Sequence, residues 1–193
     1  PLNAAGVTVT AQSLWDESRR LFEVSLDGVA IDPTLVLARG DRVRAIAKAV
    51  KAEMLAGMAA DCLGGADAVL DMTVDYLKTR RQFDRPIAMF QAPKHRCADL
   101  KARIESTKAL LWSRTSDSNA TTADLGALKA LASDVYRFVT EEAIQLHGGI
   151  GLTSEYPAHL FLKRALLNLQ LGGSLDFWRE AAGRAALEAC LAA

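Results

Sequence analysis

The spacing of apolar residues changes once along the chain, from alternation near its start to helical spacing after about residue 41. Polar and apolar residues alternate over residues 7–10 and 21–26, and the second stretch ends in Asp27-Gly28, a turn signal. This pattern predicts two short strands. Because two strands alone cannot bury a face in water, we expect them to require a larger sheet from other residues or another chain.

The remainder of the chain predicts five helices. The first covers residues 41–79, is weakened in its middle by Gly64-Gly65, and places these apolar residues on one face: Val43, Ile46, Val50, Met54, Met58, Cys62, Ala66 and Leu70. The second covers residues 90–112. The third follows a Thr121 cap and ends at Gly148-Gly149, the fourth covers residues 157–171, and the fifth covers residues 175–191. Several antiparallel helices form an all-α bundle.

Composition excludes several classes of function. The 193 residues are 50% hydrophobic, and basic and acidic residues both total 23, so the chain can bury one core and has no net charge to hold nucleic acid. Cys62, Cys97 and Cys190 are far apart and odd in number, which predicts neither disulfides nor a metal site and fits a reducing cytoplasm. We expect no export and no membrane insertion. The start lacks Met and opens near a strand, which favours a piece of a larger protein.

A basic and aromatic cluster follows the first long helix. It contains Arg80, Arg81, Gln82, Phe83 and Arg85, groups that suit a phosphate and a planar ring. The alternative is that the cations complement the helix dipole and that the ring belongs to the core.

A second cluster, Gly148-Gly149-Ile150-Gly151, follows the third helix. A C-cap explains one glycine, whereas three favour close approach of the backbone to a ligand. The three histidines, His95, His147 and His159, lack metal-ligand spacing, and we expect structural or surface roles for them.

Together these segments resemble the acyl-CoA dehydrogenase family in order and spacing. The first reads Tyr76-Leu-Lys-Thr-Arg80-Arg-Gln82-Phe83-Asp84-Arg-Pro86-Ile87, followed by Phe90-Gln91, His95 and Ala98-Asp99-Leu100. The second reads Gln145-Leu-His-Gly148-Gly149-Ile-Gly151, followed by Glu155-Tyr156-Pro157. The resemblance implies an antiparallel four-helix bundle over residues 36–193, preceded by the last strands of a middle β domain over residues 1–35.

The resemblance also implies a cofactor, FAD, and a reaction, the α,β-dehydrogenation of an acyl-CoA thioester. Arg80, Gln82, Phe83 and Gln91 would meet FAD near its pyrophosphate and adenine end. Gln145, Gly148 and Gly149 would reach the FAD of a neighbouring subunit. The implied partners are a homologous subunit and an electron-transfer flavoprotein or similar acceptor.

The chain departs from the family where the catalytic base is expected. Counting from Glu155, the usual glutamate position falls on Gly172, and the position that other members use falls on Met54. Glu53 is adjacent but lies about a hundred degrees around the helix, so it is only an alternative base. Two further departures affect FAD or interface contacts: Asp84 replaces a glycine, and Lys163-Arg164 replaces Arg-Asp.

Three hypotheses follow. The first is a subunit or fragment without a base that supplies half of an FAD site, while a homologous partner provides the glutamate. The second is a helical assembly module that has lost flavin binding, and the third is an enzyme that uses Glu53 or a base outside this sequence.

Overall fold

The computed structural model describes residues 2–192, which divide into two compact units between Val50 and Lys51. In the first unit, β1 (Val7–Ala11) pairs antiparallel with β2 (Phe22–Leu26), so that Val7 lies opposite Leu26. A short 3-10 helix, η1 (Pro33–Leu35), follows and is capped by the Asp32 carboxylate. Both predicted strands are therefore present. Phe22, Val24 and Leu26 of β2 are exposed, as expected of two strands without a larger sheet.

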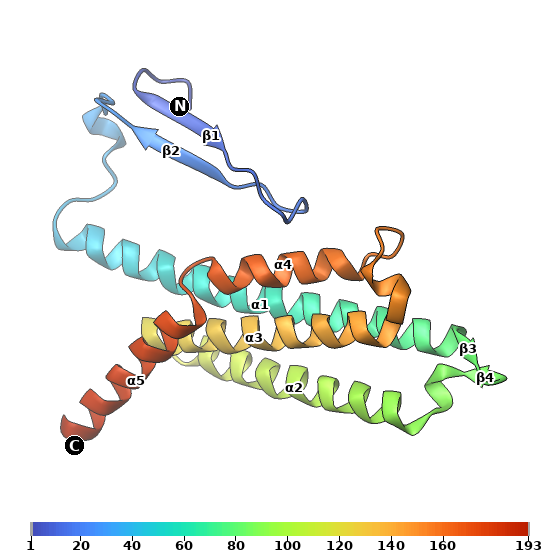
Figure 1. Cartoon of the computed structure of the whole chain (residues 1–193). Coiled ribbons are helices and arrows are strands. Elements are labelled where there is room, and N and C mark those ends of the chain that lie inside the picture. Colours follow the sequence, from blue (N-terminus) through green and yellow to red (C-terminus); the bar gives the residue numbers. More distant parts are fainter. Residues whose placement is uncertain (1, 193) are drawn as a thin grey trace. The chain divides into compact units, whose positions relative to one another are not determined.

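The second unit is an antiparallel helical bundle. Its long helices are α1 (Asp41–Thr79), which begins in the first unit, α2 (Gln91–Ser116), α3 (Thr122–His147) and α4 (Ala158–Gln170). In Figure 1 these four lie side by side and alternate in direction, while α5 (Leu175–Ala192) runs away from them at an angle. The all-α fold and the four-helix bundle with a short β segment are confirmed. The predicted boundary after residue 35 stays a prediction.

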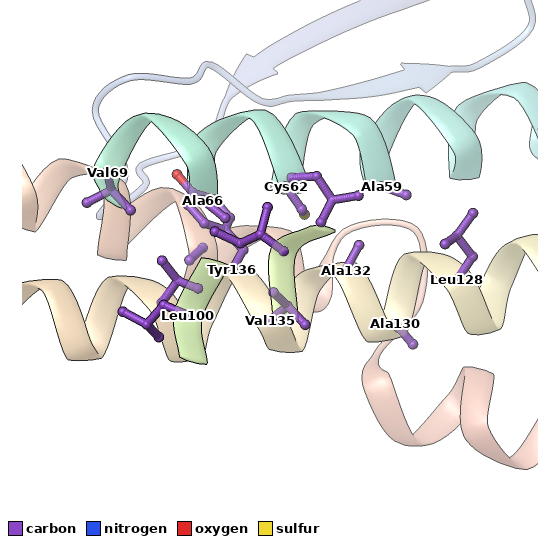
Figure 2. Close-up of a cluster of buried hydrophobic side chains, with 14 of the residues drawn as sticks. Ala59, Cys62, Ala66, Val69, Leu100, Leu128, Ala130, Ala132, Val135 and Tyr136 are labelled. Atoms are coloured by element: carbon purple, nitrogen blue, oxygen red, sulfur yellow. The ribbon is translucent and has the colours of Figure 1, made fainter. Parts of the chain in front are cut away.

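The bundle core is centred on α3, which contacts the buried faces of its neighbours. Figure 2 shows Cys62 and Ala66 of α1 beside Tyr136 of α3 in the buried cluster. Gly65 makes room for Tyr136, because a Cβ at position 65 would lie 2.5 Å from the phenol ring. Helix α1 continues without interruption through Gly64-Gly65, so this pair does not break it. Gly126 of α3 provides a similar gap for the ring of Trp178 in α5.

The apolar stripe predicted for α1 is only half correct. Cys62, Ala66 and Leu70 are buried and Met58 is half-buried, but the four earlier members of the stripe are exposed: Val43, Ile46, Val50 and Met54. Apolar spacing shows which residues share a helix face, but not whether another element covers that face. Here the first turns of α1 belong to the other compact unit, and the bundle core begins at Leu55.

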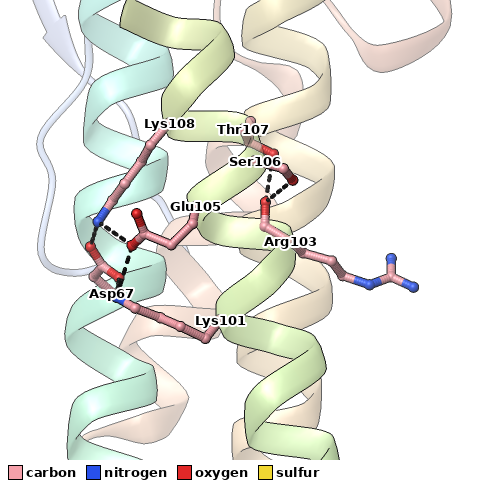
Figure 3. A network of polar contacts seen from close by, with 7 residues as sticks. All are labelled: Asp67, Lys101, Arg103, Glu105, Ser106, Thr107 and Lys108. Atoms are coloured by element: carbon pink, nitrogen blue, oxygen red, sulfur yellow. Dashed lines mark hydrogen bonds and ion pairs between the residues drawn. The ribbon is translucent and has the colours of Figure 1, made fainter.

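An ionic network joins α1 to α2 on the outside of the bundle. Figure 3 shows the Asp67 carboxylate of α1 between the ammonium groups of Lys101 and Lys108, which also pair with Glu105. Burial raises the pKa of Asp67, but the hydrogen bonds from the two lysines outweigh this and hold the pKa below its usual value. The network therefore favours the ionised carboxylate.

The segment between α1 and α2 is not an irregular linker but a minimal hairpin. β3 (Arg81–Gln82) pairs with β4 (Arg85–Pro86), and a 3-10 turn, η2 (Ile87–Met89), leads into α2. The two residues at its tip, Phe83 and Asp84, have φ values of 52° and 61°. This left-handed conformation is the reason a glycine suits position 84, and aspartate is among the few other residues that adopt it readily.

Candidate functional site

Two groups of predicted ligand-contact residues lie at one end of the bundle. Arg80, Gln82, Phe83 and Gln91 surround the β3–β4 hairpin, and Gln145, Gly148 and Gly149 end α3. The groups are linked through Tyr76 of α1, whose hydroxyl donates to the carbonyl oxygen of His147 at 3.2 Å. The structure therefore brings together residues that are about 60 positions apart in the sequence.

The hairpin presents its polar and aromatic groups to solvent. The Phe83 side chain is 85% exposed, so the alternative that this ring belongs to the core is wrong. Its ring makes an edge contact with Phe90, and the Arg85 guanidinium lies 3.9 Å from the centre of the Phe90 ring. Arg80 and Gln91 are exposed, and in the described chain their side chains make no hydrogen bond. Free guanidinium and amide donors beside an exposed ring suit a phosphate joined to a planar group.

The structure explains two of the three glycines that follow α3. Gly148 has a φ of 66° and ends the helix, with its amide donating to the Gln145 carbonyl. Gly151 is buried, and a Cβ there would lie 2.8 Å from the Ile144 carbonyl oxygen. Gly149 is exposed, and a Cβ would meet nothing within 4 Å. Helix capping explains Gly148, and close packing explains Gly151. Neither explains Gly149, which is the glycine that close approach of a ligand to the backbone would account for.

His147 is the buried residue beneath this glycine turn. It is 3% exposed; its ring stacks on Tyr76 and makes a tilted contact with Tyr156, with ring centres 4.5 Å apart in both cases. Burial lowers the pKa of His147, while a hydrogen bond between Nδ1 and the Ala143 carbonyl opposes the shift. The structure places His147 in the interior, and His95 and His159 at more accessible positions.

The position of the usual glutamate, Gly172, lies in a turn between α4 and α5. Gly172 and Gly173 have φ values of 68° and 109°, which only glycine adopts easily. Trp178 Nε1 donates to the Gly172 carbonyl at 2.9 Å, and Lys129 Nζ donates to the Gly173 carbonyl at 2.9 Å. A Cβ at position 172 would point at Met58, 2.8 Å from its sulfur. The turn therefore has no carboxylate, its backbone favours glycine, and a side chain at position 172 would require Met58 to move.

Lys129 is a functional-site neighbour that sequence reasoning missed. Its side chain is fully buried, and burial lowers its pKa. Its ammonium also lies 3.5 Å from the Leu169 carbonyl at the end of α4, where carbonyl groups attract a cation. The available signal was its position on the buried face of the third helix, next to Leu128.

Glu53, the alternative base, lies on a different surface. It lines a small cavity with Arg114 and Leu125, whereas the Gly172 turn faces Leu55 and Met58. Met54 is exposed and uncharged. Arg164, at the departure in α4, forms an ion pair with Asp61 at 3.5 Å. Among the described residues, no group of histidine, cysteine and acidic side chains could hold a metal ion.

The comparisons identify the family. Residues 45–187 match the acyl-CoA dehydrogenase C-terminal domain, so the chain belongs to the acyl-CoA dehydrogenase family. It is 44% identical over 116 residues to "Acyl-CoA dehydrogenase IpdE2" of Mycolicibacterium smegmatis, a match that covers 60% of this chain and 37% of the relative. It is 38% identical over 112 residues to the short-chain specific acyl-CoA dehydrogenase of Megasphaera elsdenii, covering 56% of this chain and 29% of that one.

A solved structure shows the same fold. Butyryl-CoA dehydrogenase from Megasphaera elsdenii superposes with a TM-score of 0.88 and 28% identity over 96% of this chain and 50% of that one. The chain thus spans about half of that structure and the matches cover about a third of the curated relatives. Within residues 2–192, no helix is long and apolar enough to cross a membrane.

Proposed function

We propose that this chain is the C-terminal part of an acyl-CoA dehydrogenase subunit that supplies half of an FAD site but no catalytic base. The observation that carries the proposal is the contrast between the β3–β4 hairpin and the turn after α4. At the hairpin, the exposed Phe83 ring and the free Arg80 and Gln91 side chains offer what a flavin dinucleotide requires. The turn at Gly172, by contrast, holds no carboxylate.

In this proposal, the chain's own residues bind and position. Arg80, with Gln82 and Gln91, would hold the pyrophosphate and adenine end of FAD, and Phe83 would cover its planar part. Gln145, Gly148 and Gly149 would reach the FAD of a neighbouring subunit. When bound, FAD supplies the acceptor for the β-hydrogen of the acyl-CoA.

The α-proton must then be taken by a glutamate of a homologous subunit, because glycine cannot accept a proton. An electron-transfer flavoprotein or similar protein would reoxidise the flavin, and a cytoplasmic location fits the free cysteines. Support comes from the name of the Mycolicibacterium relative and from the butyryl-CoA dehydrogenase fold, although the acyl group of this protein is not defined by either.

The test is to express the natural protein that contains this sequence alone and together with homologous acyl-CoA dehydrogenase subunits. We expect flavin absorbance, and bleaching by acyl-CoA only when a base-bearing partner is present. Absence of flavin in every pairing would contradict the proposal and favour an assembly module. Turnover by the protein alone that is lost in Glu53→Gln would instead identify Glu53 as the base.

A matched pair of variants tests the flavin contact itself. Arg80→Met removes an exposed guanidinium at the proposed site, whereas Arg184→Met removes one that pairs with Glu180 on α5. Loss of one charge-assisted hydrogen bond to phosphate should weaken flavin retention by about tenfold or more in Arg80→Met alone. Equal flavin content in the two variants would show that Arg80 does not contact FAD.

A further inference from the structure

The ring of His147 has a protonation state that its surroundings define. Nδ1 lies 2.7 Å from the carbonyl oxygen of Ala143, one turn earlier in α3. Because a carbonyl oxygen only accepts, Nδ1 carries the proton of a neutral ring and Nε2 carries none. Nε2 is fully buried and has no hydrogen-bond partner in the described chain. An added proton at Nε2 would therefore have no acceptor.

Among the described residues, no carboxylate forms a hydrogen bond or ion pair with the ring that would compensate a positive charge. The ionisable residues packed against it are Tyr76 from α1 and Tyr156 from the segment before α4. Burial raises the pKa of Tyr156, so this hydroxyl is neutral in acidic and neutral solution. Asp75, which precedes Tyr76 in sequence, is exposed and pairs with Lys78 at 3.1 Å. Glu142, which precedes Ala143 in α3, pairs with Arg96 of α2. The pocket therefore favours the neutral imidazole.

The same ring connects the glycine turn to the rest of the bundle. His147 is the last residue of α3, and the carbonyl that Tyr76 holds at 3.2 Å is its own. Gly148 and Gly149 follow directly, and a Cβ at Gly151 would lie 3.0 Å from the His147 Cβ. The turn is therefore joined to His147 in two ways, through the backbone carbonyl that Tyr76 holds and through the close approach of Gly151 to the His147 side chain.

We propose that His147 is a positioning residue of the flavin contact: its neutral ring holds the Gly148-Gly149 turn in place, and protonation at Nε2 releases the turn. The link to flavin rests on the function proposed above. The link between the ring and the turn does not, because it depends only on contacts within this chain.

The first experiment measures the turn without flavin. Amide hydrogen exchange of residues 148–151 in the isolated protein, corrected for intrinsic rates, should show opening that increases below pH 6.5, by up to about tenfold per pH unit. His147→Phe keeps an aromatic ring of similar size but cannot be protonated, so its corrected exchange should not vary with pH. The control is His159→Phe, because His159 also bonds a backbone carbonyl through Nδ1, at 2.8 Å, but is only half-buried. This control should retain the pH dependence of the wild type.

A second measurement remains available if His147→Phe does not fold. The His147 ring is titrated by NMR in the wild-type protein, and the Gly148 and Gly149 amide signals are followed in parallel. We expect a midpoint below 6.5 and amide shifts with the same midpoint. A midpoint at or above 6.5, or amide signals that do not follow the ring, would overturn the proposal.

The third experiment connects the turn to the cofactor. Flavin release from the complex with a homologous subunit is followed by fluorescence between pH 5 and pH 8. We expect acid-accelerated release in the wild type and in His159→Phe, and a flat profile in His147→Phe. An unchanged acid dependence in His147→Phe would overturn the positioning role, whereas a failure of every complex to bind flavin would contradict only the proposed function.

Discussion

Substitution of Gly172 by alanine tests whether the turn between α4 and α5 excludes a side chain. The added methyl group meets two obstacles in the structure. The backbone φ of 68° places any residue other than glycine in the left-handed region, which costs about 1–2 kcal/mol. The new Cβ would also lie 2.8 Å from the sulfur of Met58, and because Met58 is flexible and half-buried its displacement should cost only about 1 kcal/mol.

We therefore expect Gly172→Ala to lower the free energy of unfolding by about 2–3 kcal/mol, measured by urea denaturation. Met58→Ala provides the control, because it removes the sulfur but leaves the backbone strain unchanged. In that background the cost of Gly172→Ala should fall to the strain contribution of about 1–2 kcal/mol. Gly172→Glu meets the same obstacles, so restoring the carboxylate by this single change should not restore a base.

Two results would refute this reasoning. A loss of less than about 0.5 kcal/mol in Gly172→Ala would mean that the turn accommodates a side chain. An equal loss in the Met58→Ala background would mean that Met58 does not occupy the space in question. Either result would contradict the conclusion that the structure of this turn disfavours a side chain at the position of the usual base.

Three further predictions concern polar and charged side chains of the bundle. Asp67→Asn should lower stability at neutral pH by about 1 kcal/mol in urea denaturation. Because the folded pKa of Asp67 is lowered, its stabilisation is present above 3.8 and should disappear as the pH falls below that value, and high salt should also weaken it. Because the folded pKa of Lys129 is lowered, wild-type stability should rise with pH between that value and 10.5, and Lys129→Met should lack this contribution. Thr121→Ala removes one half of the capping box with Asp124, and we expect it to lower the thermal midpoint through a loss of about 1 kcal/mol.

The helices could be predicted from sequence because their signals are local. The Thr121 side chain caps α3 as predicted, and glycine ends this helix. The β3–β4 hairpin could not be predicted in this way, since each strand has two residues and the tip depends on the left-handed conformation of Phe83 and Asp84. Asp84 is a residue type that tolerates this conformation, but Phe83 is not, so the residue types of the tip do not indicate it.

The candidate site was predictable in its residues but not in its supporting contacts. The family motifs indicated Arg80 and Gly148 directly. The burial of Lys129 was not expected, because lysine is rarely buried and its partners are backbone carbonyls, which every residue possesses. The environment of His147 depends on Tyr76, which is 71 positions away in the sequence. Contacts at that separation follow from the packing of helices and not from local spacing.

The glycines that face aromatic rings constrain how this sequence can vary. Gly65 and Tyr136 share one volume between α1 and α3, and Gly126 and Trp178 share another between α3 and α5. A larger residue at either glycine requires a smaller ring opposite it, or a greater distance between the two helices. Substitutions at 65 and 136 should therefore occur together among relatives, and so should substitutions at 126 and 178. Each position considered alone would look variable, and only the comparison of both members of a pair would show the constraint.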